Sequence, residues 1–84
     1  MLRIEQIIEL DKVLVYLKSR GLEKSYRKSK GILLSGDTKR VDFKLRKPKD
    51  ERIYQFRITQ KYRAFAMFEG TWLKVHLISD HQDS

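Results

Sequence analysis

Apolar side chains change their spacing once in the first part of the chain. Leu2 and Ile4 alternate with charged residues over positions 2–5, which predicts a short strand. From Leu10 the apolar residues follow one another at intervals of three or four, which predicts an amphipathic helix. We expect this helix to end at Gly21, because glycine readily takes the left-handed conformation that follows a helix.

A second helix is predicted directly after the first. Leu22, Tyr26 and Leu33 share one side at helical spacing, and the helix ends near the glycine at position 31 or 36. The other side is basic and includes Lys28. Two helices joined by a short turn predict a helical hairpin.

Beyond position 36 the chain has the alternating pattern of strands. Four segments are predicted, at residues 40–46, 52–59, 62–68 and 72–79, with a proline-containing loop at 47–50 and short turns after the second and third. The segment 62–68 is apolar on both faces, as expected of a central strand. The sequence therefore predicts an α+β fold, in which the helical hairpin packs on one face of an antiparallel sheet of about four strands.

Charge is the most informative total. The 84 residues, which we expect to form a single domain over 1–84, include 19 Lys and Arg against 11 Asp and Glu, a formal net charge of +8. Nucleic acid is the usual partner of so basic a surface, although a basic protein that is merely soluble, or one that binds an acidic protein tail, has the same composition. The chain has no cysteine and no apolar run long enough to span a bilayer, so we expect a cytoplasmic protein with no membrane association.

Two arginines stand in the most hydrophobic hairpin. In FRITQKYRAFA, residues 56–66, Arg57 and Arg63 lie on adjacent strands on either side of a turn. A guanidinium among apolar side chains is costly unless an anion meets it. The anion is either a carboxylate of this chain or a phosphate from outside. The internal alternatives are Asp42 or Glu51 for Arg57, and Glu69 or Asp80 for Arg63. The strand residue His76 is expected to be structural.

The element order, the basic charge and the RIT-x-x-x-R spacing resemble those of the RelE/ParE superfamily of bacterial toxins. The likeness is strongest from Arg52 to His81, towards the RelE/YoeB-like ribosome-dependent mRNA interferases. It implies a fold of order β-α-α-β-β-β. In these toxins an arginine at the position of Arg63 contacts the scissile phosphate, another basic residue stands at Arg57, and a histidine stands at His81. Gln82 replaces a tyrosine of the YoeB-like pattern.

The resemblance implies a metal-independent endoribonuclease without a cofactor, which cuts mRNA in the ribosomal A site and is held by a cognate acidic antitoxin. Such a reaction needs a base for the ribose 2′-hydroxyl, cations on the phosphorane and an acid for the leaving oxygen. Arg57 and Arg63 would supply the cations, His81 the acid or base, and Asp42 is the nearest candidate for the base. Contacts to mRNA and ribosomal RNA are expected from four basic residues, Lys28, Lys44, Arg46 and Lys61. The alternatives are a ParE-like inhibitor of DNA gyrase and a basic RNA-binding relative without catalysis.

Overall fold

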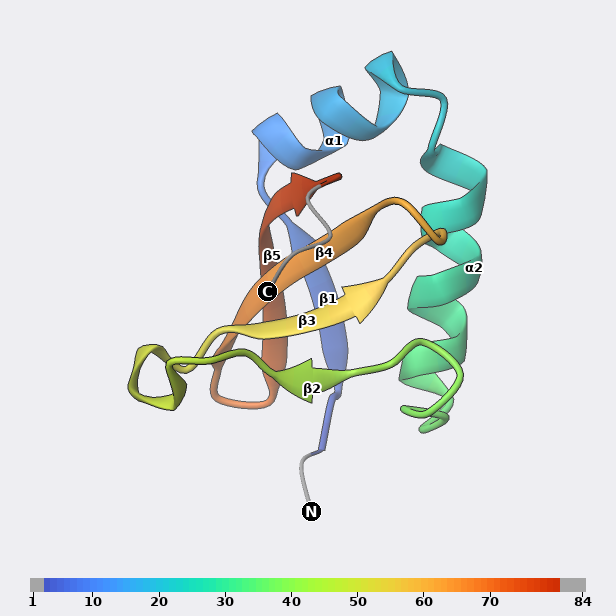
Figure 1. Ribbon diagram of the computed structural model, residues 1–84. Helices are drawn as coiled ribbons and strands as arrows, with labels where there is room; N and C mark the ends of the chain where they lie inside the picture. The colour runs from blue at the N-terminus through green and yellow to red at the C-terminus, as the bar shows by residue number, and fades with distance from the viewer. Residues whose placement is uncertain (1–2, 81–84) are drawn as a thin grey trace.

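The computed structural model describes residues 3–80, which form two α-helices and a five-stranded mixed sheet (Figure 1). The fold class is therefore α+β, as the sequence predicts. The elements in chain order are β1 (Gln6–Glu9), α1 (Asp11–Ser19), α2 (Glu23–Leu34), β2 (Lys44–Leu45), the 3-10 helix η1 (Lys49–Glu51), β3 (Tyr54–Arg57), β4 (Arg63–Glu69) and β5 (Trp72–Ser79).

Helix α1 ends at Gly21 as predicted, and of the two glycines considered for the end of α2, Gly36 marks it while Gly31 lies inside the helix. After α1, the Leu22 amide donates to the Leu17 carbonyl at 2.8 Å while Gly21 takes φ +67°. After α2, Gly36 takes φ +95° and the next amide again reaches back to the last turn of the helix. Both ends are the glycine-dependent motif in which amides beyond the helix satisfy its final carbonyls. None of the helices within residues 3–80 is long and apolar enough to cross a membrane.

The sheet differs from the predicted antiparallel sheet of about four strands. Its order is β1-β5-β4-β3-β2, so that β4 lies in the centre, as expected for the segment 62–68. The other neighbours pair antiparallel, but β1 pairs parallel with β5. The helices do not fold back on one another as a tight hairpin. Figure 1 shows α1 crossing one end of the sheet and α2 descending along its side.

Two predicted strands are misplaced. The first strand described is β1, Gln6–Glu9, because pairing with β5 sets its position and buries Ile7. Of the predicted strand 2–5, residues 3–5 lie before β1, and Leu2 lies outside the described residues. The predicted strand 40–46 is reduced to β2, Lys44–Leu45. Asp42 interrupts it with a φ of +53°, and a residue in this left-handed region cannot continue the alternation of a strand.

The two faces of the sheet are unlike. Phe56 and Ala64 stand opposite one another on β3 and β4, and both belong to the core that Val13 and Leu17 of α1 close from one side. Since neighbouring residues of a strand point to opposite faces, Arg57 and Arg63, the next pair along, point to the face away from the helices. We call this second face the open face.

A partly buried polar cluster joins β1 to α2. The Tyr26 hydroxyl donates to Glu9 Oε2 at 2.7 Å, and Lys30 Nζ lies 2.8 Å from the same oxygen. Burial and the neighbouring Glu9 carboxylate raise the pKa of Tyr26 well above its ordinary value, so its hydroxyl stays protonated as a donor. The contacts of Glu9 with Tyr26 and Lys30 hold α2 beside β1, the strand that pairs parallel with β5.

Candidate functional site

The two arginines of the hairpin form a directly opposed pair. The register of β3 and β4 places Arg57 against Arg63, and Arg63 is in turn opposite Ser79 of β5. Directly opposed residues of antiparallel strands have Cβ atoms about 4.5–5.5 Å apart and point to the same face. The hairpin thus presents two permanent positive charges side by side on the open face.

Both guanidiniums reach toward one short segment, residues 40–42, which precedes β2. The Arg57 guanidinium donates to the Arg40 carbonyl at 3.4 Å, while its backbone amide donates to the Val41 carbonyl at 2.7 Å. The Arg63 guanidinium donates to Asp42 Oδ2, also at 3.4 Å. The two side chains therefore converge on the same region, with an internal carboxylate already at its edge.

Asp42 is the internal anion of the site. Its Oδ2 atom lies 3.4 Å from Arg63 and 3.6 Å from Lys44 Nζ. Among the internal pairs considered from the sequence, Asp42 therefore belongs to Arg63 and not to Arg57, because its left-handed backbone turns the carboxylate toward β4. Glu69 pairs with Lys74 at 2.8 Å instead of with Arg63. The Arg63–Asp42 pair is partly exposed, at 22% and 41% of the two side chains, so an ion from solvent has access to it.

Lys44 and Arg46 continue the positive charge along the open face. They line a hollow of about 570 Å³ together with Lys47 and Gln55. The Arg46 guanidinium lies 4.8 Å from the centre of the Phe65 ring in a cation–π contact. Phe65 is buried on this face, and Arg46 contributes to shielding its ring from solvent. The sequence-predicted RNA contacts Lys44 and Arg46 are thus brought together.

Lys61 lies apart from these, in the turn between β3 and β4. The Thr59 hydroxyl oxygen accepts hydrogen bonds from the backbone amides of Lys61, at 3.2 Å, and Tyr62, at 3.1 Å, and these bonds stabilise the turn. The Lys61 ammonium lies 5.5 Å from the centre of the Tyr62 ring. Lys61 is exposed in this turn and does not line the hollow of Lys44 and Arg46.

His76 occupies an irregular position in β5. The pairing with β4 jumps from Val75 to Leu77, so that His76 is the extra residue of a bulge. Partial burial lowers the pKa of His76, and the positive charges of Lys12 and Arg46 lower it further. The imidazole is therefore neutral at pH 7 and adds no charge to the basic face.

A second hollow brings Lys28 close to the arginine pair. It has a volume of about 300 Å³ and lies between α2 and the end of β3. Lys28 and Ser25 line it from α2, and Arg40 and Arg57 line it from the sheet side. Arg40 was not singled out in the sequence, where its only signal is its place two residues before Asp42.

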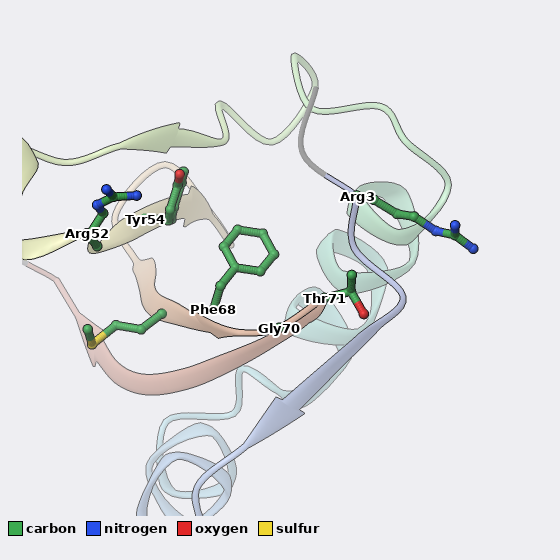
Figure 2. A pocket seen from close by; sticks show the side chains of 7 residues that line it. Arg3, Arg52, Tyr54, Phe68, Gly70 and Thr71 are labelled. Carbon is green, nitrogen blue, oxygen red and sulfur yellow. The ribbon is translucent and has the colours of Figure 1, made fainter.

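A third hollow lies at the other end of β3 and β4, as Figure 2 shows. It has a volume of about 510 Å³ and includes Arg52, Tyr54 and Phe68. The Tyr54 ring stacks on Phe43 with centroids 5.2 Å apart and meets Phe68 edge-on at the same distance. In Figure 2 the guanidinium of Arg3 extends away from these rings. The hollow thus has an aromatic wall with one arginine beside it, and no pattern in the sequence indicated this hollow.

The candidate acid or base His81 lies outside the described residues. Within residues 3–80, no group of three His, Asp or Glu side chains is arranged to hold a metal ion. The roles of Arg57, Arg63 and His81 in catalysis remain predictions. A scan against models of known protein families finds no match to this chain, and a search of curated proteins finds no significant match either.

Proposed function

We propose that this protein is a RelE/ParE-type toxin of a toxin–antitoxin module, an endoribonuclease that cuts mRNA on the ribosome and thereby stops translation. One observation carries the proposal: Arg57 and Arg63 stand directly opposite one another on the open face. A pair of permanent cations suits the phosphorane, in which negative charge increases as the 2′-oxygen attacks. The formal net charge of +8 supports RNA as the substrate and an acidic antitoxin as the partner.

The proposed step is internal transfer at one phosphate of the RNA. The ribose 2′-oxygen bonds to phosphorus as it loses its proton, and the bond from phosphorus to the 5′-oxygen of the next nucleotide breaks. That 5′-oxygen leaves with a proton, so the products are a 2′,3′-cyclic phosphate and a free 5′-hydroxyl. Arg57 and Arg63 stabilise the phosphorane, and Asp42 is the carboxylate nearest to it as base. His81 is the candidate for the leaving-group proton.

A binding protein without catalysis is the second candidate, and Asp42 is the observation that favours it. Its Oδ2 atom is shared between Arg63 and Lys44, so the carboxylate already serves as an internal partner of two cations of the basic face. A gyrase inhibitor of the ParE type or a non-cleaving RNA-binding protein needs only the basic face. The two candidates differ in one measurable outcome, which is cleavage of mRNA.

The test is expression in a bacterium, with growth, primer extension on mRNA and plasmid topology followed in parallel. Arg63→Ala should abolish both growth arrest and cleavage, because removing one transition-state contact costs about 2.7–4 kcal/mol of barrier. Arg63→Lys keeps the positive charge but loses the bidentate guanidinium, so we expect it to restore little of the growth arrest and cleavage that Arg63→Ala abolishes. The matched control is Arg27→Ala, at an exposed site on α2. Cleavage that survives in Arg63→Ala, or altered plasmid topology without cleavage, would refute the ribonuclease.

A further inference from the structure

The hollow between α2 and the end of β3 gathers positive charge from two parts of the fold. Lys28 approaches it from the helix, and Arg40 and Arg57 approach it from the opposite side. In the described part of the chain, neither Lys28 nor Arg57 makes an ion pair. Arg40 meets Asp37 at 3.8 Å, but both side chains are exposed, and such a pair is weak. Within residues 3–80, the hollow is therefore lined by basic residues, and Asp37 is the carboxylate that forms an ion pair with one of them.

Two serines also line the hollow, and one of them ties α2 to the sheet beneath it. Ser25 lies one helical turn before Lys28, so both side chains face the same way. Behind them Ser29 is buried, and its hydroxyl donates to the Ile58 carbonyl at 3.4 Å, which ties α2 to the end of β3. The residues that line the hollow thus include one lysine, two arginines and two serines, and their side chains are the kinds of donor that a tetrahedral phosphate accepts.

Arg57 links this hollow to the arginine pair. Its guanidinium donates to the carbonyl of Arg40, a residue that also lines the hollow, while its β-carbon stands beside that of Arg63. An arginine has five donor N–H groups, and only one side-chain contact of Arg57 is occupied within residues 3–80. Arg57 is therefore the residue that the arginine pair and the hollow share.

We propose that the hollow lined by Ser25, Lys28, Arg40 and Arg57 binds the phosphate next to the one at the arginine pair. The RNA strand then passes from the open face over residues 40–42 to α2. This inference rests on the proposed function, because it adds a second subsite to that site. A phosphate bound there would explain why a lysine of α2 and two arginines near the sheet edge line one hollow whose lining, among the described residues, includes no acidic residue.

The test uses two probes that do not undergo cleavage. The first is inorganic phosphate, followed by the backbone amide signals of the ¹⁵N-labelled protein. The second is a short RNA with 2′-O-methyl groups, followed by fluorescence anisotropy over a range of salt concentrations. Lys28→Ala should weaken RNA binding about tenfold and reduce the slope of log K against log salt by about 0.7, the value for one lost phosphate contact on a single strand. The control is Lys24→Ala, which removes the same charge from an exposed site of α2 outside the hollow and should cost less than twofold.

Phosphate alone should shift the amide signals of Ser25, Lys28 and Arg40, and the RNA should compete for the same signals. Equal losses in Lys28→Ala and Lys24→Ala would overturn the subsite, as would phosphate shifts that fall elsewhere. Phosphate binding in the hollow without competition from RNA would overturn the path of the strand. None of these readings depends on cleavage or growth arrest. An inactive protein that gives the expected shifts and losses would therefore refute the proposed reaction and leave the phosphate subsite intact.

Discussion

Asp42 competes with any phosphate for the cations of the open face, so removing its charge should strengthen RNA binding. Asp42→Asn is a clean change, because asparagine keeps the shape and, like aspartate, tolerates the left-handed backbone at φ +53°. The two ion pairs that it weakens are partly exposed, and such pairs contribute about 0.2–1 kcal/mol each. We therefore expect a loss of stability near 1 kcal/mol, or about 4–8 °C in Tm for a domain of this size.

The gain in binding follows from the distance between charges. A phosphate that takes the place of the carboxylate near Arg63 would otherwise lie about 4 Å from a negative charge, which costs about 1 kcal/mol in water and more near the protein. Asp42→Asn should thus bind a 2′-O-methyl RNA at least about fivefold more tightly at low salt. Asp50→Asn, on the exposed η1, removes the same charge away from the pair and should change affinity less than twofold.

The two Asn variants should be compared by fluorescence anisotropy, and cleavage by primer extension. Equal affinity in both, or weaker binding in Asp42→Asn, would refute the view that Asp42 holds the place of a phosphate. If Asp42 also takes the 2′-hydroxyl proton, Asp42→Asn will bind more tightly and cut more slowly. Tighter binding together with slower cleavage would identify Asp42 as the general base, whereas tighter binding with unchanged cleavage would identify it only as a competitor of the phosphate.

Two further predictions concern buried or partly buried groups. Tyr26→Phe should lower the unfolding free energy by about 1.5–3 kcal/mol, since the lost hydrogen bond is to the charged Glu9; urea unfolding measures this, and a change below about 0.5 kcal/mol would contradict it. His76 has a lowered pKa when folded, so the unfolded chain binds its proton more readily and stability is lost as the pH falls below about 6.5. His76→Gln should make Tm fall less between about pH 7.5 and about pH 5.5 than in the unchanged protein, and an NMR titration that places the pKa of His76 above 6.5 would contradict the reasoning.

The features that the sequence predicts well are those set by nearby residues. The ends of α1 and α2 follow from Gly21 and Gly36, and the central place of β4 follows from its two apolar faces. The parallel pairing of β1 with β5 is set by contacts between distant segments, which no local period reveals. The left-handed Asp42 is equally hidden, because valine, phenylalanine and leucine alternate around it as in a regular strand.

The candidate site likewise has features that nearby residues predict and features that depend on the packing of distant segments. The opposition of Arg57 and Arg63 was predictable, since a short turn between two strands fixes their register. The sequence also indicated Lys44 and Arg46 as neighbours on one face, and they share a hollow. The approach of Arg40 to Lys28 depends instead on how α2 packs beside the sheet, so the pattern of the chain alone did not reveal it.

The parallel pairing of β1 with β5 has a consequence for how the chain acquires its structure. β1 is synthesised before β5, yet β5 lies between β1 and the rest of the sheet. Until β5 has left the ribosome, β1 has no strand to pair with, and the apolar sides of α1 and α2 have no complete sheet to cover. Pairing of such distant segments is slow, because the long intervening chain must first be closed into a loop. We therefore expect a nascent chain that stops before Trp72 to remain unfolded and sensitive to protease, with the basic open face assembled only after β5 has been synthesised.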